Sequence, residues 1–305
     1  MTTDLFAQRH LVVASIDPTT GDIDNRNIQP LSEWQRGERN PLLVNIVHGN
    51  TLFDILKDDL DLIRYDNIEN RFFPKFITYT SEHDVEQHCM QLLGKIAEAL
   101  IVKACHKSIE ENRSWARYAR RGQNKVPTLD NFIAVGTGLH STFNSEYATK
   151  YNPNDTQRDI LWVNKDAVTN QLMMITSQNK SSGNPAGLQI KVSRDGFNYI
   201  YAKDIARAKY EVPLVYFDLG NDFQNLANAI YREDKDIDIG YDFIRGAAIN
   251  VDIHEQLYSY YFLLKYILKG QFPVQNLLNY DQILNMSVKL DIEEAFNKEK
   301  TILQV

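Results

Sequence analysis

Three polar side chains in two short apolar runs of the sequence could together hydrolyse a phosphodiester. Asp159 opens the run DILWV, and Gln189 and Lys191 lie thirty residues later in the run GLQIKVS. Carboxylate and amide oxygens bind hard cations such as Mg²⁺, for which Mn²⁺ is expected to substitute, and a lysine can orient water or phosphate. If the two runs are adjacent strands, the oxygens of Asp159 and Gln189 should lie within roughly 6 Å and share one cation.

The spacing within the second run is that of a strand. Alternate side chains of a strand point to one face, so Gln189 and Lys191 would share a face. Ile190 would then pack on the opposite face and offer its backbone carbonyl as a further ligand. Asp155 is an alternative acid, although Asp159 begins the apolar run directly, and Asp159 also fits the cap of a turn before the strand.

Periodicity predicts the elements that would position these residues. Apolar residues recur at helical spacing from Val85 to Ile101, which predicts a helix over 82–120. Short β-rich runs between turn residues predict strands at 131–136, 159–164, 187–193 and 212–219. A helix is predicted over 202–210, before the last of these strands, and 171–177 is left open as a strand or a helical turn.

The flanks of this core have a different character. Residues 1–80 contain the short apolar runs LVVASI and LLVNIV, which suggest strands and hairpins, with a helix over 51–63. Beyond residue 222, helices are predicted at 252–269 and around 289–300. We therefore predict an N-terminal segment (1–80), a core (81–222) and a helical C-terminal segment (223–305).

The order helix, three strands, helix, strand, together with Asp159 and the Gln-Ile-Lys triplet, resembles the PD-(D/E)XK superfamily of restriction-endonuclease-like nucleases. The resemblance covers 81–222 and implies an α/β fold with a central mixed β-sheet flanked by helices. It implies metal ligation by Asp159 and Gln189, with Lys191 as the catalytic lysine. Two features depart from the usual pattern: no proline precedes Asp159, and Gln189 replaces the usual glutamate, as in the Mrr-like enzymes, which should weaken metal binding.

The superfamily usually carries a further glutamate on the first helix, and the resemblance assigns this catalytic role to Glu98. On a helical wheel Glu98 lies nearly opposite the centre of the apolar stripe, so a solvated glutamate is the competing interpretation. Glu86 lies closer to the stripe and is the alternative. The loop at 136–141, GTGLHS, lacks the lysine of a P-loop and is expected to lie near the active site.

The charge distribution bears on nucleic-acid binding. The net charge of −7 argues against a surface coated in nucleic acid, because affinity for phosphates comes largely from Lys and Arg. Cations gather in 103–125, where Trp115 and Tyr118 would stack on bases. The residues expected to contact DNA are Arg113, Arg117, Arg120, Arg121, Lys125 and Arg194. The competing interpretation is the solvated end of a long helix.

The sequence therefore predicts a Mg²⁺-dependent endonuclease acting on double-stranded DNA, and the resemblance implies restriction or anti-phage defence and a homodimer. The first ten residues form no signal-peptide core and no apolar run reaches about 18 residues, which predicts a cytoplasmic protein without a membrane partner. One alternative is a catalytically inactive nucleic-acid-binding or assembly protein with the same fold. The other is an enzyme on a different α/β fold, in which the strands at 159 and 187 are not neighbours.

Overall fold

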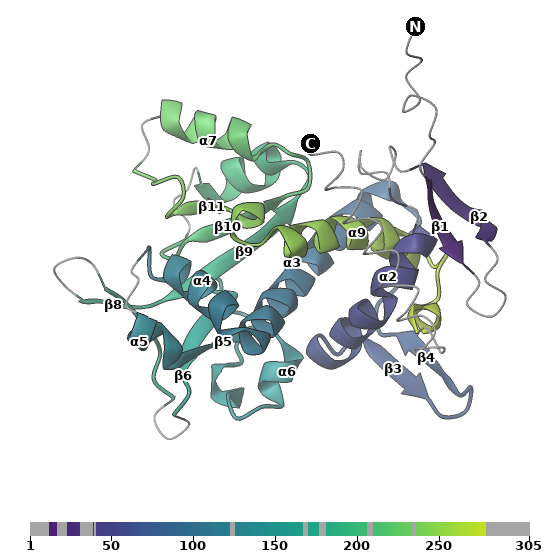
Figure 1. Ribbon diagram of the computed structural model, residues 1–305, viewed down its shortest axis with the longest axis horizontal. Coiled ribbons are helices and arrows are strands. Elements are labelled where there is room, and N and C mark those ends of the chain that lie inside the picture. Colours follow the sequence, from purple (N-terminus) through teal and green to yellow (C-terminus); the bar gives the residue numbers. More distant parts are fainter. Residues whose placement is uncertain are drawn as a thin grey trace, which may run out of the picture. The chain divides into compact units, whose positions relative to one another are not determined.

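The computed structural model describes residues 12–16, 23–30, 39, 41–122, 126–166, 170–176, 181–205, 210–233 and 236–278. The chain forms two compact units (Figure 1). The first, here called the sheet unit, comprises Ile55–Leu62 and Glu86–Leu257. The second comprises Met1–Asp54, Ile63–Val85 and Tyr258–Val305. The units interleave along the sequence, whereas the sequence predicts three consecutive segments.

The sheet unit is built on a five-stranded mixed sheet. Its strands, in spatial order, are β11 (Phe243–Arg245), β10 (Leu214–Asp218), β9 (Gly187–Ser193), β6 (Ile160–Asn164) and β5 (Phe132–Gly136). β5, β6 and β9 pair antiparallel, whereas β9, β10 and β11 pair parallel. The protein is therefore α/β with a mixed sheet flanked by helices. β6 and β9 are neighbours, which excludes the alternative fold in which they are separated.

Strand β10 is buried on both faces, as its continuous apolar sequence predicts. Leu214 and Tyr216 pack in a cluster with residues of η3 (Phe197–Ile205) and α7 (Phe223–Arg232). On the other face, the ring of Phe217 stacks on His254 of α9 (Val251–Leu268) with centroids 6.3 Å apart. The sheet therefore forms the middle layer of its unit.

The helix predicted over 82–120 is two helices, α3 (Glu82–Lys107) and α4 (Ile109–Ala119). The chain is extended at Ser108, whose hydroxyl accepts a hydrogen bond from the backbone nitrogen of Glu111 at 3.2 Å and so begins a new helix. Asn112 then attaches α4 to the sheet. Its amide nitrogen donates to the Phe132 carbonyl at 2.9 Å, and its amide oxygen accepts from the Trp162 indole at 3.0 Å.

The connections between strands carry short elements. After β5 come α6 (His140–Phe143) and η2 (Ala148–Lys150), and α5 (Val126–Asp130) precedes it. The segment left open at 171–177 contains a strand, β7 (Met174–Thr176), which pairs with β8 (Ser181–Pro185) in a hairpin between β6 and β9. The helix predicted over 202–210 is present in its first part as η3, which is a π-helix and begins earlier, at Phe197; residues 206–209 lie outside the described ranges.

The second unit contains two antiparallel hairpins, β1 (Val12–Ile16) with β2 (Ile23–Pro30) and β3 (Ile63–Asp66) with β4 (Arg71–Pro74). The run LLVNIV, predicted as a strand, is part of α2 (Pro41–Asp54), because a short apolar run fits a buried helix equally well. The helix predicted over 51–63 is the end of α2 with η1 (Ile55–Asp59), which belongs to the sheet unit.

The C-terminal part is described as far as residue 278. The predicted helix over 252–269 is α9, and it is followed by η4 (Val274–Leu277). Tyr260 and Tyr261 of α9 are buried, which makes them core residues. The helix predicted around 289–300 lies outside the described residues. Among the described helices, none is both long and apolar enough to cross a membrane.

Candidate active site

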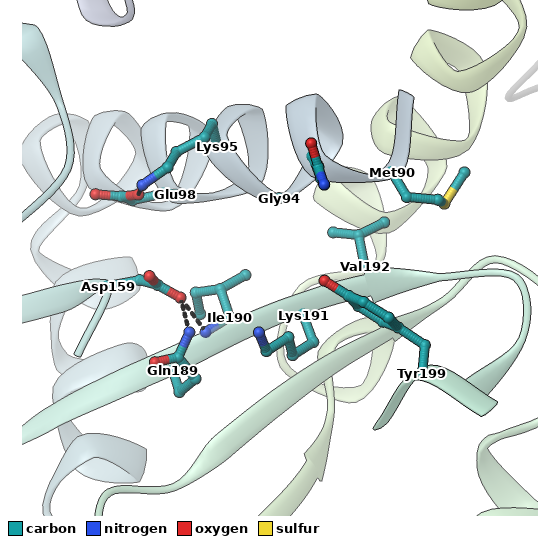
Figure 2. Close-up of a pocket in the computed structure, with 11 residues that line it drawn as sticks. Met90, Gly94, Lys95, Glu98, Asp159, Gln189, Ile190, Lys191, Val192 and Tyr199 are labelled. Atoms are coloured by element: carbon teal, nitrogen blue, oxygen red, sulfur yellow. Dashed lines mark hydrogen bonds and ion pairs between the residues drawn. The ribbon is translucent and has the colours of Figure 1, made fainter. Parts of the chain in front are cut away.

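A cavity of about 210 Å³ in the sheet unit lies between α3 and β9 (Figure 2). Asp159, Gln189 and Lys191 all line this cavity, as does Glu98 of α3. Its polar lining comprises Gln91, Lys95, Glu98, Asp159, Gln189, Lys191 and Tyr199. The structure thus brings together all four residues that the sequence singled out for catalysis.

Asp159 lies where the pairing of β6 with β9 ends. Ile160, the first residue of β6, is opposite Leu188, so β9 continues beyond the start of β6. The backbone nitrogen of Asp159 donates to the Leu188 carbonyl at 2.9 Å, and its Oδ2 accepts from the backbone nitrogen of Ile190 at 2.8 Å. Because the N–H and C=O of one strand residue point to the same edge, the Ile190 carbonyl also points to the Asp159 side.

Gln189 is in direct contact with Asp159. Its Nε2 donates to Asp159 Oδ2 at 2.5 Å, so the two side chains are as close as a shared cation requires. Gln189 is only 6% exposed, and its Oε1 is buried with no hydrogen-bond partner among the residues that the structure describes. An unpaired buried oxygen is costly, so this amide oxygen would gain from a partner such as a cation.

Lys191 and Gln189 point to the same face of β9, as predicted. In the parallel pairing with β10, Gln189 is opposite Leu214 and Lys191 is opposite Tyr216, and these two residues of β10 pack in one cluster. Burial, the largest single influence, lowers the pKa of Lys191, but nearby tyrosines and Asp204 together outweigh it and the net pKa is raised. Lys191 is therefore a cation at neutral pH. It is suited to attract a phosphate or hold a water molecule, not to accept a proton.

Glu98 is 1% exposed, so the interpretation as a solvated glutamate is wrong. Its carboxylate accepts a hydrogen bond from the Gly138 backbone nitrogen at 2.9 Å and lies 3.4 Å from Lys95 Nζ. Burial raises the pKa of Glu98 to about 7; the charge of Lys95 opposes this shift and that of Asp159 adds to it. The polar face of α3 lines the cavity, and the alternative, Glu86, is not part of the lining.

The loop at 136–141, which was expected near the active site, contacts the backbone of Asp159 and the side chain of Glu98. The backbone nitrogen of Thr137 donates to the Asp159 carbonyl at 2.8 Å, and that of Gly138 donates to Glu98. A Cβ on Gly136 would lie 2.8 Å from Glu98 Oε1, so glycine permits this close approach. One short loop therefore fixes the position of both acids.

The two acids near the start of β6 have different roles. Asp155 Oδ1 accepts hydrogen bonds from the backbone nitrogens of Gln157 and Arg158 at 2.8 and 3.1 Å, so Asp155 caps the turn. Asp155 does not line the cavity. Burial raises the pKa of Asp159 against the opposing effect of the Ile190 N–H. Of Asp155 and Asp159, only Asp159 therefore lies in the cavity.

The basic stretch of α4 is less open to DNA than the sequence suggests. Arg113 forms two hydrogen bonds of 2.7 Å to Asp130, and Arg121 Nη1 lies 2.7 Å from Asp242 Oδ1. Arg120 is only 5% exposed, and burial lowers its pKa. These three guanidinium groups are engaged or covered within the protein.

The other three residues predicted to contact DNA are Arg117, Arg194 and Lys125. Arg117 and Arg194 are exposed, and Lys125 lies outside the described residues. Trp115, expected to stack on bases, is fully buried and donates from its indole to Glu111 at 3.2 Å. That expectation is wrong, because Trp115 lies on the face of α4 that packs into the core.

The donor set of the cavity suits a hard divalent cation. Glu98 and Asp159 supply carboxylates, Gln189 an amide oxygen without a partner among the described residues, and Ile190 a backbone carbonyl. No group of three or more His, Cys, Asp or Glu side chains in the described ranges is arranged to hold a metal ion. The two carboxylates would therefore need the Gln189 amide oxygen and the Ile190 carbonyl to complete a cation site. Mg²⁺ and Ca²⁺ accept amide and carbonyl oxygens as ligands.

Three polar residues of the cavity were not predicted from the sequence: Gln91, Lys95 and Tyr199. Lys95 precedes Glu98 by three residues on a helix, so helical spacing could have identified it. Tyr199 belongs to the π-helix η3, whose winding no local sequence pattern predicted. Comparisons of the chain with protein-family models, with curated proteins and with solved structures find no match. Its function must therefore be inferred from the geometry of the cavity.

Proposed function

We propose that this protein is a Mg²⁺-dependent endonuclease that hydrolyses phosphodiester bonds of double-stranded DNA. The supporting observation is the convergence of Glu98, Asp159, Gln189 and Lys191 in one cavity, from one helix and two adjacent segments of the sheet. The order of elements around it, with α3, β5, β6, β9, η3 and β10 in sequence, agrees with the superfamily that the sequence resembles. Short helices and a hairpin are added between them.

The cation would be held by Asp159, the Gln189 amide oxygen and the Ile190 carbonyl, with Glu98 beside them. When bound, Mg²⁺ or Mn²⁺ neutralises charge at the scissile phosphate and lowers the pKa of a water molecule. The Ile190 N–H holds the Asp159 carboxylate in a fixed orientation. For Gln189 to act as a ligand, its amide would have to rotate by a half-turn, so that the oxygen takes the present place of the nitrogen.

The other polar side chains act on the substrate and on the water. Lys191 attracts the scissile phosphate, because it remains a cation in the cavity. Glu98, with a pKa of about 7, is suited to accept a proton from the attacking water near neutral pH. Lys95 partly balances the charge of Glu98 at the mouth of the cavity.

Plasmid cleavage in the presence of Mg²⁺ tests the proposal. Asp159→Asn and Lys191→Ala should each slow cleavage by roughly 10²- to 10³-fold, which is typical for loss of a group that stabilises the transition state. Lys103→Ala is the control, because Lys103 pairs with Asp59 and does not line the cavity. Undiminished cleavage in both cavity variants would remove these residues from the mechanism.

A second candidate is a catalytically inactive nucleic-acid-binding or assembly protein with the same fold. The observation that favours it is the orientation of Gln189, which directs its amide nitrogen and not its oxygen at Asp159. Mg²⁺-independent DNA binding by the wild-type protein, without cleavage of any DNA tested, would support this candidate. Wild-type cleavage that a chelator abolishes would exclude it.

A further inference from the structure

We propose that Asp204 is a positioning residue that holds Lys191 in place for the reaction, with the rings of Tyr199 and Tyr210 completing the enclosure. The inference rests on the proposed function for its catalytic consequence. Lys191 Nζ lies 3.8 Å from Asp204 Oδ2, and 5.7 and 5.6 Å from the ring centroids of Tyr199 and Tyr210. A carboxylate and two aromatic rings thus surround the ammonium, and we call this set the lysine cage.

Lys191 needs such support because lysine has a long, flexible side chain. An unrestrained lysine samples many rotamers and extends its ammonium into water. Here the Lys191 side chain is only 17% exposed, and its base is fixed on the central strand β9. The cage limits the ammonium to one position at the cavity.

The cage also keeps Lys191 from neutralising Asp159. The charge of Lys191 acts on Asp159 and favours its ionised form, so the two groups attract each other. A direct ion pair between them would occupy the carboxylate that the proposed cation needs. Asp204 attracts the ammonium from the η3 side, which leaves Asp159 to its contacts with Gln189 and Ile190.

The π-helical form of η3 explains how two cage residues face one lysine. Tyr199 and Asp204 are five residues apart, and a π-helix makes i→i+5 hydrogen bonds that bring such residues to one side. In an α-helix, they would point about 140° apart. The wider helix is therefore what allows both side chains to contact Lys191.

Asp204 has the burial expected of a residue that requires a cation. It is 4% exposed and lines a second cavity of about 160 Å³, together with Tyr210, Arg121 and Asp242. Arg121 is paired with Asp242 at 2.7 Å. A buried carboxylate is costly unless a positive charge compensates it, and Lys191 supplies that charge.

A purely structural ion pair is the competing explanation, and Asp59 provides a matched control. Asp59 is 6% exposed and pairs with Lys103 at 2.9 Å in the same unit, outside the cavity. Asp59→Asn should change stability without changing the motion or function of Lys191. Asp204→Asn removes the charge of the cage, and Asp204→Glu retains it and reports whether the carboxylate itself is required.

The first measurement is the mobility of the Lys191 ammonium, from ¹⁵N side-chain relaxation in the full-length protein, which does not depend on enzymatic activity. We expect an ordered ammonium in the wild type, in Asp59→Asn and in Asp204→Glu, and a mobile one in Asp204→Asn. An ammonium that stays equally ordered in Asp204→Asn would overturn the proposal. Thermal unfolding of each variant verifies that it is folded.

The second measurement is plasmid cleavage under saturating Mg²⁺. Asp204→Asn should lower kcat roughly 10- to 100-fold with KM nearly unchanged, as expected when a catalytic group is displaced by about 1 Å. Asp204→Glu should restore most of the rate, and Asp59→Asn should match the wild type. Equal losses in Asp204→Asn and Asp59→Asn would refute positioning. An inactive wild type would instead refute the nuclease function, while the relaxation data still decide whether Asp204 holds Lys191.

Discussion

Gln189 Nε2 and Asp159 Oδ2 are 2.5 Å apart, and the same oxygen also accepts a hydrogen bond from Ile190. One of the two carboxylate oxygens of Asp159 is thus engaged by two donors of the protein. A glutamate in place of Gln189 would put two carboxylates in contact, together with the nearby Glu98. The glutamine therefore avoids repulsion between buried carboxylates, and it would limit the affinity of the proposed cation site.

Gln189→Glu should destabilise the metal-free protein and strengthen cation binding. The substitution removes a donor to Asp159 and adds a buried negative charge, which should cost about 1–3 kcal/mol in chelator. Mg²⁺ should restore the melting temperature, and calorimetry should show tighter Mg²⁺ binding than in the wild type. Gln224→Glu, on the exposed face of α7, is the control. A variant that is equally stable with and without Mg²⁺ would contradict metal ligation at this position.

Asp159→Ala and Asp159→Asn should differ in stability and resemble each other in cation binding. Alanine leaves the Ile190 N–H and the Gln189 amide without their acceptor, which should cost about 1–3 kcal/mol in urea unfolding. Asparagine retains an acceptor oxygen and should cost less. Both variants lose the negative charge, so both should bind Mn²⁺ weakly by paramagnetic resonance. Wild-type Mn²⁺ affinity in either variant would argue against the site.

Glu98→Gln should remove a pH-dependent loss of stability. The pKa of Glu98 rises from 4.5 to about 7 in the folded protein, so its stabilising contribution is complete below pH 4.5 and is lost as the pH rises through 7. The loss amounts to about 3 kcal/mol, so the variant should gain stability over the wild type at pH 8 and not at pH 4.5. Denaturant unfolding in chelator across this range measures the difference. Glu86→Gln is the control, and a pH-independent difference for Glu98→Gln would be inconsistent with a buried, ionising Glu98.

Asn112→Ala should weaken the attachment of α4 to the sheet and lower the free energy of unfolding. Asn112 is 2% exposed and joins the Phe132 carbonyl to the Trp162 indole, so its loss leaves two buried groups unpaired. The expected cost is about 2–4 kcal/mol, measured by urea unfolding. Asn144→Ala, at an exposed position, should cost less than about 0.5 kcal/mol. Equal costs for the two variants would show that the Asn112 bridge contributes little.

Four of the five strands of the central sheet were the most predictable part of this fold, whereas β11 lies in the segment predicted as helical. The runs at 132–136, 160–164, 187–193 and 214–218 are β-rich and bounded by turn residues, and each is a strand within two residues of its expected ends. The break between α3 and α4 was missed, although Ser108 followed by Glu111 is a helix-start pattern. The predicted helix was extended past Ile101 to residue 120, although the apolar periodicity that supports it ends before Ser108.

Glu98 and the lysine cage depended on information that one sequence does not contain. A helical wheel assumes that a helix has one buried face, whereas both faces of α3 are covered around Glu98. Tyr199 and Asp204 face Lys191 because η3 winds as a π-helix, and no rule of local sequence predicted that winding. Partners brought together by tertiary packing could be identified only from the structure.

The start of β6 directly after Asp159 also determines where this chain tolerates changes in length. The hairpin β7–β8 fills the sequence between β6 and β9, so residues can be added or removed there while Asp159 stays opposite Gln189. One residue inserted between Gly187 and Gln189 would instead turn Gln189 and Lys191 to the opposite face of the sheet. The connection between β6 and β9 can therefore vary in length, whereas the register of β9 from Gly187 to Lys191 cannot change.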